Sequence, residues 1–266
     1  MSRERIEDWL FRTGYWLVAG LVLLPIAVVV VTSFQESQLL QFPPGDYSLE
    51  WYRQFATSRR WMSAIVDSFV IGIGASALST TLGVAGALAT RRSDSRLAEI
   101  LQATVLLPLL IPPVVLGLTF LIYFESIGLT NDVIRVIIAH TIWITPLAYF
   151  IMQSVFSRFD WRIREAGVDL GARPRQAFAY VVFPGVKHGI AIAALVTFIV
   201  SLQEFIMALY LTGFGTRTVP VLAWNLLNQS LTPMVSVVST FLVAISILVV
   251  FVATTIINLD WLATRI

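Results

Sequence analysis

The sequence predicts an all-α integral membrane protein with six transmembrane helices and one two-helix cytoplasmic loop. One reason is composition, because 57% of the 266 residues are hydrophobic and 13% are charged, whereas about a quarter of the residues in soluble domains are charged. A second reason is that the chain has six apolar runs, each long enough to supply the roughly 20 residues that cross a ~30 Å hydrocarbon core. The third is a long polar interval, Arg158–Ile190, between the fourth and fifth runs.

The six predicted spans lie, in chain order, at Thr13–Phe34, Ala64–Thr90, Ala103–Phe124, Asp132–Ser154, Gly189–Leu211 and Val235–Ile257. Between the first two, residues 35–61 turn polar, and we expect a loop with one short helix whose aromatic side chains lie at the membrane surface. Three parts follow from these spans. Residues 1–61 hold the N-terminal segment, the first span and an outer loop. Residues 62–257 form the core domain with its loop at 155–188, and residues 258–266 form a cytoplasmic tail.

The second and third spans carry residues that indicate close packing and a break. The second is rich in Gly, Ala, Ser and Thr, and small residues let the backbones of membrane helices approach each other. The third contains Pro108, Pro112 and Pro113, and proline removes an amide donor and bends a helix. Freed backbone groups in a membrane need neighbouring protein or a cavity. We therefore expect helix breaks at these prolines, on a span that lines the bundle interior.

The distribution of basic residues predicts the orientation of the chain. With the N-terminus inside, alternate loops place 13 of the 18 Lys and Arg residues on the inner side and 5 on the outer side. Cytoplasmic loops carry the excess of positive charge in membrane proteins. We therefore expect both termini and the interval Arg158–Ile190 to face the cytoplasm.

Several classes of function are disfavoured by composition. The chain has no cysteine, which excludes thiol catalysis and cysteine metal sites, and its two histidines are too few and too scattered for a histidine metal site. No GxxxxGK[ST] loop is present, so we expect no ATP site, no catalytic residue, no metal and no cofactor in this chain. The arginines lie in short loops between spans and not on one patch, which disfavours nucleic acid as a partner.

The polar interval has the pattern of two short helices. Asp160 is a candidate N-cap, and an apolar face follows it at helical spacing, made of Ile163, Ala166, Gly167 and Leu170. Glu165 and Asp169 form an i, i+4 pair on another face. Gly171 is placed to end the first helix and Pro174 to begin the second. From spacing alone, a docking element and an amphipathic loop that covers helix ends remain equally open.

The sequence E-A-G-V-D-L-G-A at 165–172, with Pro184 and Gly189-Ile190 downstream, resembles the EAA loop of permease subunits in binding-protein-dependent ABC importers, written E-A-A-x-x-x-G. This chain departs from the pattern at Gly167, Phe183 and His188. The resemblance implies the type I ABC importer transmembrane fold and a loop presented to a cytoplasmic ATPase. The residues that would make that contact are Glu165, Ala166, Gly167, Asp169, Leu170, Gly171 and Ala172.

The resemblance to these permeases extends over about residues 61–257, and three stretches resemble one group within the family. SLQEF at 201–205, TVP at 218–220 and the run that begins at Pro233 resemble the second permease of spermidine/putrescine importers. Members of that group often carry an acidic residue after this proline, where this chain has Met234. The implied solute is a polyamine or a similar small charged compound. The implied partners are a second, different permease, two ATPase subunits that bind ATP and Mg, and an extracytoplasmic solute-binding protein, in a bacterial inner membrane.

A carboxylate inside a span is a functional candidate because an unpaired charge in the bilayer is costly. Glu204, about 15 residues into the fifth span, is predicted to meet a cationic solute with Gln203 and Ser201. The alternative is that Glu204 pairs with a partner subunit or caps a helix. His140 is expected to be a hydrogen-bonded packing residue.

Two other functions remain open from the sequence. An ion-coupled secondary transporter would use Asp67, Glu125 and Glu204 as a proton relay, and a membrane-embedded assembly factor would carry no solute.

Overall fold

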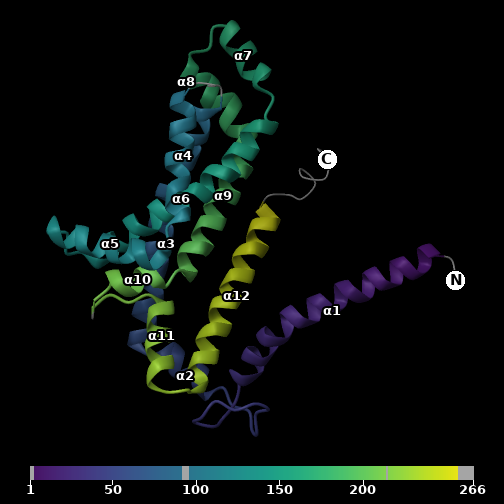
Figure 1. Cartoon of the computed structure of the whole chain (residues 1–266), viewed down its shortest axis with the longest axis vertical. Coiled ribbons are helices and arrows are strands. Elements are labelled where there is room, and N and C mark those ends of the chain that lie inside the picture. The colour runs from purple at the N-terminus through teal and green to yellow at the C-terminus, as the bar shows by residue number, and fades with distance from the viewer. Residues whose placement is uncertain (1–2, 92–95, 214, 257–266) are drawn as a thin grey trace. The chain divides into compact units, whose positions relative to one another are not determined.

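The computed structural model describes residues 3–91, 96–213 and 215–256. Over these residues the chain is helical apart from loops, turns and one isolated bridge between Gln35 and Tyr47 (Figure 1). Five helices in the described part are long and apolar enough to cross a membrane, and a bent helix pair makes a sixth span if it counts as one. The predicted all-α membrane class is confirmed. The predicted tail at 258–266 lies outside the described residues.

The helices are α1 (Arg3–Thr32), α2 (Glu50–Thr57), α3 (Arg59–Thr90), α4 (Arg96–Leu110), α5 (Pro113–Ser126), α6 (Asp132–Arg158), α7 (Trp161–Asp169), α8 (Pro174–Ala177), the π-helical turn η1 (Phe178–Val182), α9 (Phe183–Gln203), α10 (Ile206–Leu211), α11 (Val219–Gln229) and α12 (Pro233–Ile256). They form two compact units. Over the described residues, the first unit comprises 3–62 and 222–245, and the second comprises 63–221 and 246–256.

The first unit is held together at the ends of α1, α2 and α12. The ring of Phe55 on α2 lies 5.4 Å from that of Trp61 and 5.1 Å from that of Phe241. Thr32, at the end of α1, donates a hydrogen bond of 3.0 Å to Ser236 on α12. The predicted short helix in the loop after the first span is confirmed as α2.

The second unit is a bundle in which α6 packs against α9 and small residues of α3 lie against both helices. A Cβ atom added to Gly83 on α3 would lie 2.6 Å from the Cβ of Ala148 on α6. Ser76 on α3 donates a hydrogen bond of 2.6 Å to the carbonyl of Ala194 on α9. The small residues of α3 therefore act as the sequence predicts, because a larger side chain at Gly83 would push α3 and α6 apart.

The third predicted span is two helices. The axes of α4 and α5 differ by 101° across a short break. Pro112 is extended there, with φ −56° and ψ 136°, and Pro113 begins α5. Pro108 lies inside α4, which continues to Leu110. After the bend, α5 packs against α10, and the buried core between them includes Leu116 and Met207.

The fifth predicted span is wrong at both ends. Helical structure runs without interruption from Pro174 to Gln203 through α8, η1 and α9, so this span begins before the expected Gly189. At the other end, α9 stops at Gln203 and α10 begins separately at Ile206. The physical reason is Glu204, whose side chain bonds the free amides of α10 and so stabilises a new helix start. The loop expected at 212–234 contains α11.

Candidate functional site

The helix α7 begins as the sequence predicts. Asp160 is its N-cap, and its Oδ1 atom accepts a hydrogen bond of 3.0 Å from the backbone N–H of Arg162. This bond satisfies one of the donors that have no partner within a first helical turn. The predicted N-cap is therefore confirmed, and it fixes where the chain turns after α6.

The end of α7 depends on Gly171. The N–H of Gly171 bonds the carbonyl of Val168 at 2.9 Å, and the N–H of Ala172 bonds the carbonyl of Gly167 at 3.1 Å, which is the Schellman pattern of helix termination. Gly171 has φ +94°, a conformation that L-residues with a Cβ rarely adopt. The predicted helix stop is confirmed, and three residues further on Pro174 begins α8.

The base of this loop is anchored by Trp161. Its indole N–H donates a hydrogen bond of 2.9 Å to the carbonyl of Phe156, and its ring meets that of Phe159 edge-on at 4.9 Å. The guanidinium of Arg91 lies over the Trp161 ring, 3.2 Å from its centroid, a distance at which a cation is attracted by the ring. Because α7 also packs against α8 and η1, the loop is a supported element and not a free connection.

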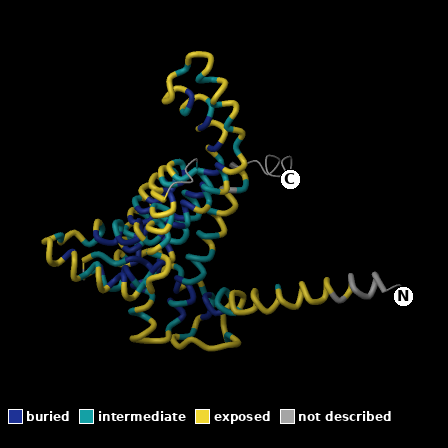
Figure 2. The backbone as a smooth tube through the Cα atoms, turned by 45° about the horizontal axis from the view of Figure 1, so that its top comes forward, coloured by how far each residue is buried: buried dark blue, intermediate teal, exposed yellow. Residues whose placement is uncertain are grey.

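The residues at the tip of the loop are exposed (Figure 2). Leu170 is 89% exposed and Tyr180 is 80% exposed. On the predicted apolar face, Gly167 is half-buried with its Cα facing Val181, while Ile163 and Ala166 are exposed. Glu165 and Asp169 are exposed as well. An anchored helix with an unburied leucine at its end, together with an exposed tyrosine on η1, is suited to contact another protein.

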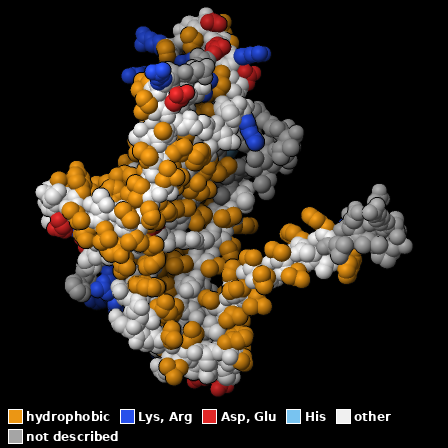
Figure 3. Space-filling view, viewed as in Figure 1, with side chains coloured by type: hydrophobic (Ala, Val, Ile, Leu, Met, Phe, Trp, Pro, Cys, Tyr) orange, Lys and Arg blue, Asp and Glu red, His pale blue; other side chains and the backbone are white. Residues whose placement is uncertain are grey.

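Charge gathers at the same end of the second unit. Figure 3 shows basic and acidic side chains together over α7 and α8, while hydrophobic side chains cover the helices beside them. The basic residues of this end include Arg162, Arg164, Arg173 and Arg175. The loop therefore combines an apolar tip with a charged surround, as the cores and rims of protein interfaces do.

The carboxylate of Glu204 lies at the break between α9 and α10 and is buried, with a relative exposure of 8%. Its Oε1 accepts a bond of 2.9 Å from the N–H of Met207, and its Oε2 accepts one of 3.3 Å from the N–H of Ala208. The ring of His140 on α6 lies between this carboxylate and Ser201, with Nε2 at 3.0 Å from Glu204 Oε2 and Nδ1 at 2.8 Å from Ser201 Oγ. Glu204 thus caps α10, as one of the two sequence hypotheses allowed.

The donors and acceptors of this cluster match a neutral imidazole beside an ionised carboxylate. In that arrangement the Nε2–H of His140 donates to Glu204, and the hydroxyl of Ser201 donates to Nδ1. The expected hydrogen-bonded role of His140 is confirmed. Gln203 is exposed, and its amide donates a bond of 2.9 Å to Ser246. The structure therefore brings Ser201 and Glu204 together through His140 and places Gln203 outside the cluster.

Similarity to known proteins identifies the class of the chain. Residues 79–266 match the family described as binding-protein-dependent transport system inner membrane component. The chain belongs to this family. It is 27% identical over 236 residues to the putrescine transport system permease protein PotI of Escherichia coli (strain K12), covering 86% of this chain and 84% of that protein. It is 23% identical over 238 residues to the spermidine/putrescine permease PotC of Haemophilus influenzae, covering 88% and 91%.

The fold of the permease also matches a solved structure. The crystal structure of a bacterial ABC transporter involved in the import of the acidic polysaccharide alginate has a chain with a TM-score of 0.76 at 13% identity, covering 96% of this chain and 97% of that one. At this identity the match shows the fold alone. Together with the family, it confirms the predicted type: this permease is a multi-pass transmembrane subunit of an ABC importer.

Proposed function

We propose that the permease transmits ATP-driven movement through the loop from Trp161 to Ala177. The exposed residues Glu165, Leu170 and Gly171 contact a cytoplasmic ATPase subunit, and Ala166, Gly167, Asp169 and Ala172 complete the contact. Closure of the ATPase subunits moves the loop as a rigid body and switches the solute path between outward and inward access. In this arrangement both termini are cytoplasmic.

The observation that carries this proposal is the combination of an anchored base and an exposed tip. Trp161 fixes α7 to the end of α6 through its bond to Phe156, while Leu170 at the other end of α7 is 89% exposed. A loop that only covered helix ends would turn its leucine inward, because burying such a side chain is worth about 1.5–3 kcal/mol. An exposed leucine on a rigid helix is accounted for by a partner surface.

The proposed assembly contains four further subunits of three kinds. These are a second, different permease, two ATPase subunits that hold ATP and Mg, and an extracytoplasmic solute-binding protein. The family supports the binding protein, since its description names binding-protein-dependent systems. This chain needs no cofactor, metal or nucleic acid for that role.

The proposed solute is a polyamine or a similar small organic cation. Two relatives named as putrescine and spermidine/putrescine permeases support this class. The second support is the buried carboxylate of Glu204, whose negative charge acts through a medium of low dielectric and favours a cation nearby. In this account Gln203 lines the path, and Ser201 and His140 hold Glu204 in place behind it.

Solute-stimulated ATP hydrolysis by the reconstituted complex tests the loop assignment. We expect Glu165→Lys to reduce the stimulation by at least about tenfold, because it reverses a charge at the contact, where loss of a charged pair costs about 2–5 kcal/mol. The control is Glu36→Lys, the same charge reversal at an exposed residue of the outer loop.

Gly171→Leu also lowers coupling, because a Cβ at φ +94° strains the helix end by about 1–3 kcal/mol. Gly171→Asn is its matched control, since asparagine tolerates left-handed backbone better than leucine. Stimulation that is unchanged in both Glu165→Lys and Gly171→Leu contradicts the assignment.

A further inference from the structure

A cavity of about 230 Å³ lies in the first unit, and neither the loop residues nor Glu204 line it. Its apolar lining consists mainly of Trp51, Trp61, Leu222 and Met234, each less than 9% exposed. The remaining lining consists of Leu226 and of three polar residues, Arg60 and Gln229, which are exposed, and Thr232. The cavity is therefore apolar where it is buried and polar where it is exposed, which suits an amphipathic ligand.

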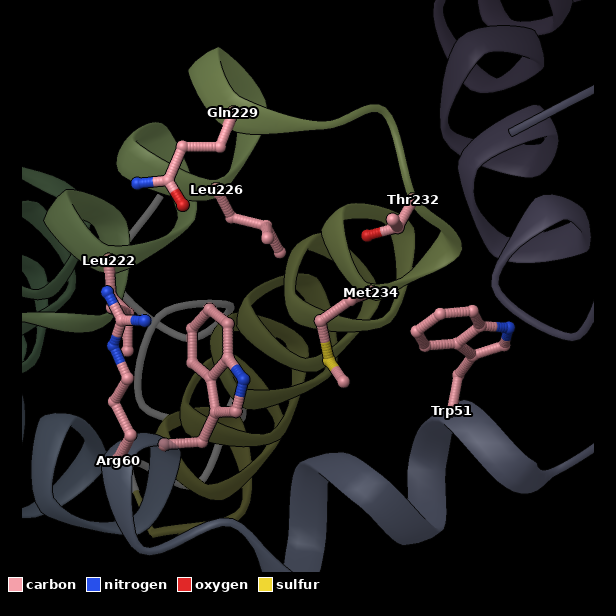
Figure 4. A pocket seen from close by; sticks show the side chains of 8 residues that line it. Trp51, Arg60, Leu222, Leu226, Gln229, Thr232 and Met234 are labelled. Carbon is pink, nitrogen blue, oxygen red and sulfur yellow. The ribbon is translucent and has the colours of Figure 1, made fainter. Parts of the chain in front are cut away.

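Two polar side chains of the cavity have no partner that the described residues supply. The hydroxyl of Thr232 is buried and has no hydrogen-bond partner among the described residues. Arg60 has no ion pair within the part of the chain that the structure describes, and no acidic residue lines the cavity. Figure 4 shows the guanidinium of Arg60 and the amide of Gln229 on one side, with Thr232 and Trp51 on the other. A ligand that carries oxygen atoms on both sides of the cavity would accept hydrogen bonds from Arg60, Gln229 and Thr232.

The cavity lies at the level where membrane spans end. Within the first unit, the span Arg59–Thr90 begins next to the lining residues 60 and 61, and the span Pro233–Val252 begins between the lining residues 232 and 234. Span ends coincide with the lipid head groups, where Trp and Arg side chains concentrate. The position therefore points to a lipid.

We propose that this cavity binds the phosphodiester head group of an anionic phospholipid. The planar guanidinium of Arg60 matches two phosphate oxygens, and an ester or hydroxyl oxygen of the same lipid, on the opposite side of the cavity, accepts a hydrogen bond from Thr232. The glycerol ester region of the lipid covers Trp61 and Met234. A free phosphate ion would leave that apolar floor uncovered, which is why the lipid is preferred to a soluble anion.

The test is native mass spectrometry of the permease, purified in mild detergent with the subunits that copurify, during titration with phosphatidylglycerol. We expect Arg60→Gln to raise the half-saturating lipid concentration at least about tenfold, since hydrogen bonds to charged groups contribute roughly 1.5–3 kcal/mol. The matched control is Arg59→Gln, the neighbouring arginine, which does not line the cavity. Thr232→Val, which keeps the shape of the side chain, raises the concentration roughly threefold.

The outcomes separate the sources of the ligand. Retention of phosphatidylglycerol that falls in Arg60→Gln and Thr232→Val but not in Arg59→Gln supports the proposal. Equal effects of Arg60→Gln and Arg59→Gln overturn it. So does displacement of the lipid by millimolar inorganic phosphate, which identifies a soluble anion as the occupant. Loss of a copurifying subunit in Arg60→Gln, with lipid retention unchanged, assigns Arg60 to a carboxylate of that subunit and also overturns it.

Discussion

Glu204 acts at two levels of the structure. Its two oxygens accept bonds from the backbone of α10 and from His140, so the residue ends one helix, starts the next and places a negative charge inside the membrane. Each of these bonds offsets part of the cost of burying a carboxylate. The same side chain therefore stabilises the break, and the proposed function adds an effect of its charge on a cation in the path.

Glu204→Gln separates these two contributions. The amide keeps one acceptor for Met207 but directs its NH₂ group toward His140 and Ala208, so we expect a loss of stability of about 1–3 kcal/mol. Removal of the charge is expected to weaken cation transport more than assembly.

The measurement is the initial rate of solute uptake, set against the amount of complex that assembles and its Tm. Ser201→Ala is the control, because it removes a bond to His140 and leaves the charge. A proportional loss of uptake and assembly in Glu204→Gln contradicts a role in the path.

The residues that sequence alone identified are those whose partners are local. Asp160 and Gly171 bond backbone groups within five positions along the chain, so capping rules suffice to predict them. The contact of His140 with Glu204 joins residues 64 positions apart, and no local pattern reports such a pair. The sequence therefore predicted the start and the end of α7 correctly, whereas it placed the start of the next span too late and suggested Glu204 without its partners.

Among the elements, α3 and α6 approach each other closely. Gly83 faces the backbone of Ala148 and Tyr149. An added Cβ would lie 2.8 Å from the carbonyl carbon of Ala148 and 2.8 Å from the backbone nitrogen of Tyr149. Neither helix backbone can move aside locally, because Tyr149 and Ala148 are fully buried in a packed core.

We expect Gly83→Ala to lower the stability of the purified permease by about 1–3 kcal/mol, the range for overpacked cores. The measurement is the Tm in detergent. Gly20→Ala on α1 is the matched control, since nothing lies within 4 Å of the added Cβ. A Tm that is equal in the two variants contradicts the close packing of α3 and α6.

The two broken spans show what hydropathy cannot predict. Apolar residues continue through the bend between α4 and α5 and through the break after Gln203, so the predicted spans ran across both. Pro112 indicated the first break because it lacks an amide donor. The second break depends on Glu204, which accepts a hydrogen bond from the first turn of α10. Sequence rules look for such caps only where a helix is expected to begin, and no helix start was expected inside this apolar run.

For the whole molecule, the orientation rests on charge. The loop end of the second unit carries Arg158, Arg162, Arg164, Arg173 and Arg175, and such an excess belongs on the cytoplasmic side. The absence of cysteine from the sequence makes a direct test possible without background labelling.

A membrane-impermeant maleimide applied to intact cells is expected to label Asp46→Cys, in the exposed loop before α2, and not Asp169→Cys in α7. Both sites are exposed on the permease itself, so both label after the cells are permeabilised and the ATPase subunits that cover Asp169 in the proposed assembly are stripped from the membrane, and this is the control. Labelling of Asp169→Cys in intact cells would place the loop outside and contradict the docking role.

Uptake into proteoliposomes tests the central claim most directly. The permease and its copurifying subunits are reconstituted with the binding protein outside, and entry of labelled putrescine is followed with and without ATP on the side that bears the loop. An ABC importer permease gives uptake that requires ATP and persists when the proton gradient is collapsed. Uptake driven by a proton gradient in the absence of ATP would instead identify an ion-coupled transporter and contradict the account.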